Sequence, residues 1–339
     1  MTTFPVTDST LSASHLASFI RETYGLAEKT TCKVFRTGIN HTYMVSGNHL
    51  KYVWRVYSYN WRSETEILEE LRLLNILKEN DIPVSYPIMD KNQNYIQTLH
   101  APEGKRYAVL FSFAEGEKIR DLSKETCQII GSVMARIHKV TVHKTLDRIK
   151  YNPETLTLLP YQYACRHYAE GMEEMQFVKA AGKAITQLFE RANVRQIRPG
   201  IVHMDMWYDN MNIKNESLVT LFDFDFCGNG WLILDIAYFN LQLFNTTPDK
   251  AIYEEKMENF MQGYEAITPI TPDEKKILPY AGMASWIFYL GVQAQRFDNW
   301  SNIFFTNNYL KHYIGLVKRW MEHHGITIDT LQNEVANQS

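Results

Sequence analysis

A chain of 339 residues exceeds the size at which a single hydrophobic core stops growing, so its length predicts two lobes with a cleft between them. A composition that is 45% hydrophobic and 22% charged supports full cores and excludes a largely disordered protein. With 35 basic against 38 acidic residues, a formal net charge of −3 and no long Lys/Arg run, the chain offers no basic patch for nucleic acid or for a membrane surface.

The sequence shows neither a targeting segment nor a crosslinking pattern. Residues 1–11 have no basic leader and no unbroken apolar segment, and no later stretch approaches the roughly 20 apolar residues that cross a bilayer. The four cysteines are far apart and form no Cys-x-x-Cys pair, so they predict neither a zinc site nor a disulfide framework. We therefore expect a cytoplasmic monomer or homodimer with no nucleic-acid or membrane partner.

The first third of the chain predicts a helix followed by an antiparallel sheet. Apolar residues at helical spacing predict a helix over 14–24, and Gly25 follows as its C-terminal cap. Over 33–57, β-branched and aromatic residues alternate with polar ones between turns, which predicts about three strands. Two more strand-like runs follow, at 95–99 and 107–113.

Residues 63–78 predict a helix whose apolar stripe decides which acidic side chain points inward. Ser63 can cap its start. At about 100° per residue, Glu70 lies at the edge of the stripe, whereas Glu69 lies on the opposite side. Glu70 can therefore reach a neighbouring strand, and Glu69 is expected to face water.

From Ser123 to Trp320 the pattern becomes helical, interrupted once over 201–226 by short strand-like runs. The sequence therefore predicts an α+β chain, with a sheet-rich lobe followed by a mainly helical lobe and a polar tail. The predicted parts are 1–115, 116–325 and 326–339.

The interruption contains a loop, 203–210, with chemically informative spacing. His203, Asp205 and Asn210 form H-x-D-x-x-x-x-N, and Asp223 follows. Phosphoryl transfer needs a carboxylate that orients the attacking hydroxyl and oxygen ligands that hold Mg²⁺ on the phosphates of ATP. Asp205 can do the first, and Asn210 with Asp223 the second.

The segment 211–226 predicts a hairpin that returns Asp223 to this loop. Two aspartates inside the apolar run 221–226 conflict with strand propensity and indicate a function. Strand alternation would place Asp223 and Asp225 on one face and the phenylalanines on the other. The alternative is an ordinary edge hairpin with solvated acids and a core histidine at His203, which requires the spacing to be a coincidence.

These motifs resemble those of the kinase-like phosphotransferases, a group that includes aminoglycoside phosphotransferases, choline kinases, type II homoserine kinases and bacterial stress-response kinase A. The resemblance extends from the run 52–87 through Gly131-x-x-Met134-Ala135-x-x-His138 to Asp235-Ile236-Ala237, and so covers most of the chain. It implies a two-lobed protein-kinase-like fold that uses ATP and Mg²⁺. The run from Asp223 to Asp235 looks closest to the stress-kinase and homoserine-kinase branch.

The resemblance also implies a role for each polar residue of the motif. Asp205 would be the catalytic base, and His203 and Asp235 would brace its loop. The implied metal ligands are Asn210 and Asp223, with Asp225 as a further candidate.

One position departs from the family pattern. The ATP-anchoring lysine of the third strand should fall within 52–57, where this sequence has Arg55. Arginine binds phosphate through two nitrogens and stays charged, but its planar fork is not sterically equivalent to lysine. Lys51 is on the same strand face but about 13 Å away at 3.3 Å per residue. Glu70 is the expected partner of Arg55, and an exposed surface pair is the alternative.

The turn 37–43 occupies the place of the family's nucleotide-covering loop. The resemblance implies that backbone N–H groups around Gly38 and Asn40 approach the phosphates. Adenine would be bound mainly by backbone groups near 111–114.

Three functions are compatible with these residues. A small-molecule kinase acting on homoserine, an amino alcohol, an aminoglycoside or a sugar-like acceptor is favoured, because the long helical half can build an enclosed acceptor pocket. The alternatives are a protein Ser/Thr kinase of the stress-response type and, because of Arg55, a nucleotide-binding module that has lost catalysis.

Overall fold

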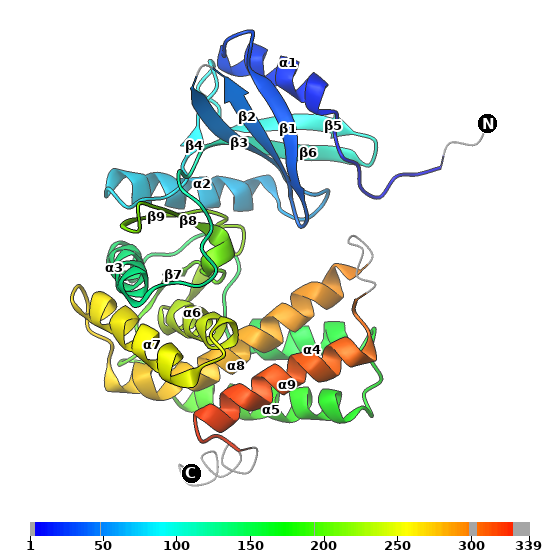
Figure 1. The fold of residues 1–339 in the computed structure, drawn as a ribbon. Helices are drawn as coiled ribbons and strands as arrows, with labels where there is room; N and C mark the ends of the chain where they lie inside the picture. Colours follow the sequence, from blue (N-terminus) through cyan, green and yellow to red (C-terminus); the bar gives the residue numbers. More distant parts are fainter. Residues whose placement is uncertain (1–3, 48, 193, 298–303, 328–339) are drawn as a thin grey trace. The chain divides into compact units, whose positions relative to one another are not determined.

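The computed structural model describes residues 4–47, 49–192, 194–297 and 304–327. Two compact units are present (Figure 1). The N-terminal unit consists of Met1–Gly116 and Thr220–Phe222, and the C-terminal unit of Glu117–Val219 and Asp223–Ser339. Most of the predicted polar tail, from residue 328 onward, lies outside the described residues. Among the described residues, no helix is both long and apolar enough to cross a lipid bilayer.

The N-terminal unit is built on a six-stranded antiparallel sheet. Its strands are β1 (Thr31–Thr37), β2 (His41–Gly47), β3 (Leu50–Val56), β4 (Pro87–Ile88), β5 (Ile96–Ala101) and β6 (Gly104–Ser112). The order is β1-β2-β3-β6-β4, with β5 pairing with β6. The predicted three-strand meander and the two later strands are therefore confirmed.

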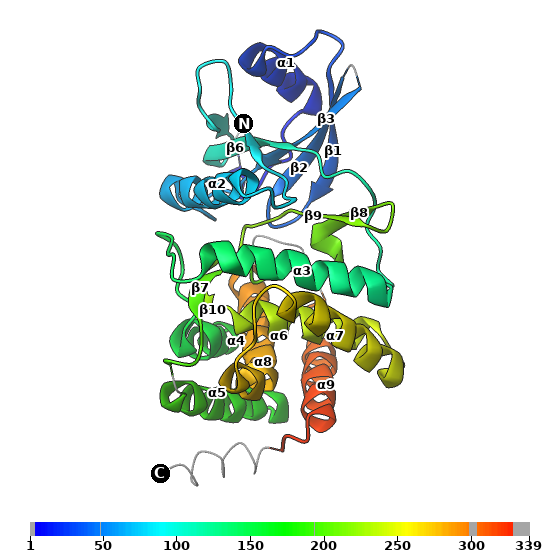
Figure 2. The same cartoon turned by 90° about the vertical axis from the view of Figure 1, so that its left-hand side faces the viewer.

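Helices α1 (Ala13–Tyr24) and α2 (Glu64–Glu79) lie on opposite sides of this sheet (Figures 1 and 2). Gly25 ends α1 in a left-handed conformation, at φ 66°, and its N–H bonds to the carbonyl of Arg21, as a glycine cap does. Ser63 begins α2 in a reciprocal capping box with Glu66. Both predicted helices are therefore present with their expected caps.

The pleat of β3 separates an apolar face from a polar one. Trp54 and Val56 are buried in one core with α1 residues such as Ile20. Because successive side chains of a strand point to opposite faces, Arg55 and Tyr57 point away from that core. Both reach Glu70 of α2, as described below.

The C-terminal unit is mainly helical. Its helices are α3 (Lys124–Thr141), the π-helical η1 (Glu154–Leu158), α4 (Leu159–Ala164), α5 (Glu173–Arg191), the 3-10 turn η2 (Tyr208–Asn210), α6 (Ile233–Thr246), α7 (Lys250–Glu265), α8 (Pro272–Gln295) and α9 (Asn307–His323). Two short antiparallel ladders interrupt them: β7 (Pro199–Val202) pairs with β10 (Gly228–Trp231), and β8 (Met211–Lys214) pairs with β9 (Leu218–Leu221).

The strand predicted to continue through residue 226 is wrong. Strand β9 ends at Leu221, and Asp223 adopts the left-handed region at φ 63°, which breaks an extended backbone. Side chains replace the ladder partners beyond this point: Arg148 donates to the carbonyls of Asp225 and Cys227 at 2.5 and 2.8 Å. The predicted alternation of acids and phenylalanines therefore does not occur.

Two glycines let α3 and α7 pack with their backbones in contact. A Cβ atom at Gly263 would lie 1.9 Å from the carbonyl oxygen of Gln128, and one at Gly131 would lie 2.1 Å from that of Phe260. Neither carbonyl can move without shifting its helix. Each glycine is therefore a packing requirement of the C-terminal unit.

Replacing Gly263 by alanine is expected to lower the free energy of unfolding by roughly 1–3 kcal/mol, because the extra methyl group overpacks the crossing. Urea denaturation followed by circular dichroism measures this. Gly315→Ala in α9 is the control, since its Cβ would have its nearest neighbour at 3.9 Å. The free energy of unfolding of that variant should be unchanged or higher by up to about 1 kcal/mol, because alanine has a better helix propensity than glycine. Equal unfolding midpoints for the two variants would contradict the prediction.

Candidate active site

The catalytic loop predicted at 203–210 follows β7 and ends in η2. The amide nitrogen of Asn210 donates to the carboxylate oxygen Oδ2 of Asp205 at 2.7 Å and to its backbone carbonyl at 3.0 Å. The loop therefore folds back on itself and brings these two predicted site residues into direct contact.

A tyrosine that the sequence analysis did not select binds the other carboxylate oxygen. The hydroxyl of Tyr238, on α6, donates to Oδ1 of Asp205 at 2.6 Å. The ring of Tyr238 stacks on that of Tyr289 from α8, and the Tyr289 hydroxyl donates to the carbonyl of Met204 at 3.1 Å. Both tyrosines therefore belong to the surroundings of Asp205.

Burial raises the pKa of Asp205 to about 7, well above the usual range of a carboxyl group. The hydrogen bonds from Tyr238, Tyr289 and Asn210 oppose this shift, whereas the negative charge of Asp223 adds to it. The structure thus brings Asp205 and Asn210 into direct contact, and the charge of Asp223 acts on Asp205.

Asp235, at the start of α6, holds the backbone of the loop. Its two carboxylate oxygens accept the N–H groups of His203 at 2.8 Å and Met204 at 2.7 Å. Met204 is left-handed at φ 64°, a costly conformation for a residue with a side chain. The fully buried His138 contacts Asp235 through Nε2 at 3.1 Å. Asp235 is therefore placed to stabilise a strained turn. His203 adds a second contact within the loop, because its Nδ1 atom accepts the N–H of Asp205 at 3.2 Å.

The oxygen donors near Asp205 fit a magnesium–nucleotide complex. The side-chain nitrogen of Asn210 points at Asp205, so the side-chain oxygen of Asn210 points elsewhere. Asp223 is a further carboxylate whose charge acts on Asp205. Within the described part of the chain, no three His, Cys, Asp or Glu side chains could hold a metal ion by themselves. Mg²⁺ on a nucleotide requires only one or two carboxylates in addition to phosphate oxygens and water, so this set of donors suits it. Asp225, which is 2% exposed, lies two residues after Asp223.

In the N-terminal unit, Arg55 and Glu70 form a buried ion pair. Nη1 of Arg55 lies 2.9 Å from Oε1 of Glu70, and the two side chains are only 8% and 1% exposed, which excludes the surface pair considered as the alternative. The hydroxyl of Tyr57 donates to the second oxygen of Glu70 at 3.0 Å. The guanidinium group of Arg55 also lies 5.2 Å from the ring centre of Phe111. Glu69 instead pairs with Arg72 at 2.7 Å.

The loop with Gly38 and Asn40 is tied to the end of β3. Oδ1 of Asn40 accepts the N–H of Ser58 at 3.2 Å, and the Ser58 hydroxyl donates to the carbonyl of Ile39 at 2.5 Å. Gly38 has open space where a Cβ would stand. The loop is therefore fixed at Ser58 and uncrowded at Gly38.

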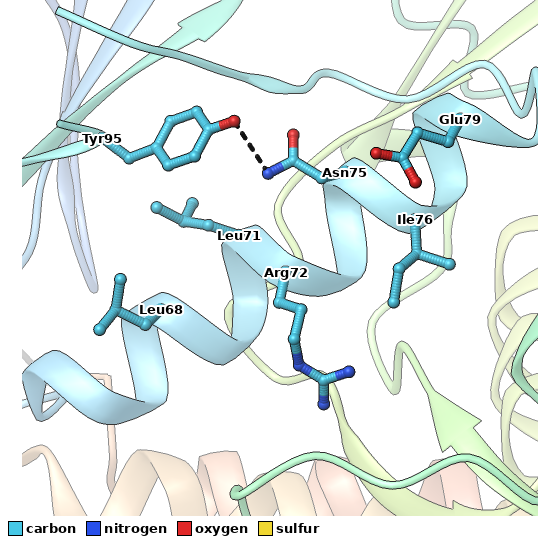
Figure 3. Close-up of a pocket in the computed structure, with 7 residues that line it drawn as sticks. All are labelled: Leu68, Leu71, Arg72, Asn75, Ile76, Glu79 and Tyr95. Carbon is cyan, nitrogen blue, oxygen red and sulfur yellow. Dashed lines mark hydrogen bonds between the residues drawn. The ribbon is translucent and has the colours of Figure 1, made fainter. Parts of the chain in front are cut away.

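A cavity of about 310 Å³ lies along α2 of the N-terminal unit (Figure 3). The residues that line it are Leu68, Leu71, Arg72, Asn75, Ile76, Glu79 and Tyr95. The only hydrogen bond drawn among them joins Asn75 to Tyr95, at 3.1 Å. None of them is a predicted site residue.

Comparison with solved structures identifies the fold. An amicoumacin kinase in complex with AMP-PNP and Ca²⁺ is similar over 94% of this chain and 96% of its own, with a TM-score of 0.72 and 17% identity. A microcompartment-associated aminopropanol kinase is similar over 93% and 99%, with a TM-score of 0.74 and 17% identity. The protein-kinase-like α+β fold predicted from the sequence is therefore confirmed.

The sequence comparison then identifies the family. The profile of the phosphotransferase enzyme family matches residues 31–270, and the chain belongs to that family. A homoserine kinase of Rhodopseudomonas palustris (strain BisB18) is 26% identical over 282 residues, 83% of each chain. The chain is thus a phosphotransferase, as the motif resemblance implied.

Proposed function

We propose that this protein transfers the γ-phosphate of ATP to a hydroxyl group of a small molecule, with Mg²⁺ bound to the nucleotide. The observation that supports the proposal is the direct hydrogen bond between Asn210 and Asp205 in one loop of the C-terminal unit, with the charge of Asp223 acting on the same carboxylate. A carboxylate beside two further oxygen ligands is the set of groups that phosphoryl transfer requires.

In this proposal Asp205 is the catalytic base. Its carboxylate accepts a hydrogen bond from the acceptor hydroxyl and orients the oxygen toward phosphorus. It takes the proton as the new P–O bond forms, while the bond from the γ-phosphorus to the β,γ-bridging oxygen breaks and ADP leaves. Asn210 and Asp223 would hold the metal, and Asp225 is a further ligand candidate. The ion would neutralise charge on the phosphates. His203 and Asp235 keep the loop in place.

The N-terminal unit supplies the nucleotide contacts in this proposal. Arg55 binds phosphate oxygens while Glu70 holds its guanidinium group, which is the arrangement of the family's lysine–glutamate pair with a bidentate head group in place of an ammonium. The backbone of the loop at Gly38 and Asn40 covers the phosphates. An intact Arg55–Glu70 pair favours an active kinase over a module that has lost catalysis.

The comparisons favour small acceptors that carry a hydroxyl near an amine. A homoserine kinase is among the relatives in sequence, and an aminopropanol kinase is among those in structure. We therefore expect homoserine and short amino alcohols to be the first acceptors worth testing, followed by aminoglycosides.

The test is an acceptor screen that measures ADP release from ATP. We expect one acceptor to stimulate ADP release at least roughly tenfold over the acceptor-free rate, with EDTA abolishing turnover and added Mg²⁺ restoring it. Mass spectrometry should show one phosphate on the acceptor for each ADP. Radiolabel from γ-labelled ATP on proteins of an extract but on no metabolite would instead support a protein kinase. A Mg²⁺-dependent thermal shift with ATP but no turnover would support a catalytically impaired module.

A further inference from the structure

We infer that Tyr238 and Tyr289 are a pair of positioning residues for the base, Tyr238 orienting the carboxylate of Asp205 and Tyr289 holding the backbone that presents it. This inference rests on the proposed function of Asp205. Neither tyrosine belongs to the motif that identified the loop. One comes from α6 and the other from α8.

The contact made by Tyr238 fixes one end of the carboxylate. Its hydroxyl donates to Oδ1 of Asp205 at 2.6 Å, and Asn210 donates to Oδ2 at 2.7 Å. Because both oxygens accept hydrogen bonds, rotation of the carboxylate plane breaks at least one hydrogen bond to a charged acceptor. Tyr238 itself is 3% exposed, so its ring is held by packing.

The position of Tyr238 on α6 links it to the loop backbone. Tyr238 is three residues after Asp235, so both lie on the same face of the helix. Asp235 accepts the N–H groups of His203 and Met204 from that face. A single rigid helix therefore orients both the loop and the side chain of its base.

Tyr289 secures the residue immediately before the base. Met204 has a left-handed backbone, and such strain persists only where the surroundings over-determine it. Asp235 holds the N–H group of Met204, and Tyr289 holds its carbonyl at 3.1 Å. The rings of Tyr238 and Tyr289 stack with centroids 5.2 Å apart and an interplanar angle of 29°, so displacing one tyrosine disturbs the other.

The pair should act on the chemical step and not on nucleotide binding. A base displaced by about 1 Å can cost about a hundredfold in rate. The tyrosines touch Asp205 and Met204, while the nucleotide is assigned to Arg55 and the metal ligands. A change in kcat without a change in the KM for ATP is therefore the signature of this role.

The experiment compares two Tyr→Phe variants with a matched control. Tyr238→Phe is expected to lower kcat roughly 10- to 100-fold, with the KM for ATP within about twofold of wild type. Tyr289→Phe should shift kcat in the same direction, by about three- to tenfold. The control is Tyr253→Phe, since Tyr253 is 2% exposed in the same unit and its hydroxyl bonds to Oδ1 of Asn240 on α6. It removes a buried tyrosine hydrogen bond to the same helix away from Asp205, and should leave kcat unchanged.

The outcomes separate this inference from the proposed function. A kcat for Tyr238→Phe within about twofold of wild type, or an equal loss in Tyr253→Phe, would overturn the inference while the proposed function stands. Should Tyr238→Phe not fold, Tyr289→Phe decides, and unchanged kcat in that variant overturns the inference. If wild type phosphorylates no acceptor, the proposed function fails. Crystal structures of wild type and Tyr238→Phe then decide: a rotated Asp205 carboxylate supports the inference, and an unmoved one refutes it.

Discussion

Replacing Asp205 by asparagine is expected to lower kcat by roughly 10³-fold, within the range that a general base contributes. The amide cannot accept the proton of the acceptor hydroxyl. In the wild type, Tyr238 and Asn210 each donate to a carboxylate oxygen of Asp205. In the variant one of these two donors would face an NH₂ group instead of an oxygen. Initial rates of ADP release at saturating acceptor measure the loss. Calorimetric titration with ATP and Mg²⁺ should show a dissociation constant within about threefold of wild type.

Asp209 provides the matched control for this variant. It lies four residues from Asp205 in the same loop, and its carboxylate pairs with Nζ of Lys118 at 2.6 Å. Asp209→Asn makes the same chemical change at a partly exposed ion pair, so kcat should fall less than about threefold. Undiminished turnover in Asp205→Asn would remove this residue from the role of base. An equal loss in Asp209→Asn would indicate damage to the loop as a whole.

Local patterns predicted the N-terminal unit because its elements depend on neighbours in sequence. The helical stripe of α2 correctly placed Glu70 on the buried side, and Ser63 and Gly25 act as the expected caps. The pairing of Arg55 with Glu70 was implied by the resemblance to the family's lysine–glutamate pair, and the helical stripe selected Glu70 as the partner. These features need no knowledge of distant contacts.

The segment around Asp223 could not be predicted in the same way. Residues 221–226 alternate as a strand does, but side chains from Arg148 and Tyr151 bond to the carbonyls of Asp225, Phe226 and Cys227 in place of a neighbouring strand. These partners lie more than seventy residues away, so no local pattern records them. Strand propensity did indicate that this segment is unusual, because aspartate is a poor strand former and the apolar run contains two of them.

The two tyrosines beside Asp205 illustrate a different limit. Helix α6 is buried along nearly its whole length, so its hydrophobic pattern favours no single face. The spacing of Tyr238 from Asp235 was a usable signal, because a helix that points one residue at the loop points its i+3 neighbour there too. Tyr289 lies in the long apolar helix α8, and its role depends on the packing of α8 against α6. A single sequence does not encode that packing in a readable pattern.

The buried Arg55–Glu70 pair should be important for stability as well as for binding. Removing one member of a buried ion pair leaves an uncompensated charge and costs about 3–5 kcal/mol. Glu70→Leu is therefore expected to lower the free energy of unfolding by that amount, measured by urea denaturation. Glu69→Leu is the control, because its partner Arg72 is 45% exposed and such pairs contribute about 0–1 kcal/mol.

A double variant then separates the structural contribution of the pair from its binding contribution. Arg55→Met combined with Glu70→Leu removes both charges and keeps an apolar volume, so it should recover most of the stability lost in Glu70→Leu. It should not recover function, since no cation remains at this position of β3 to bind phosphate. We expect its KM for ATP to rise roughly tenfold or more over wild type, the loss of about one charge-assisted hydrogen bond. A stable double variant with an unchanged KM for ATP would mean that Arg55 serves the fold alone. In that variant the fold is intact, so any effect on KM comes from the missing guanidinium group.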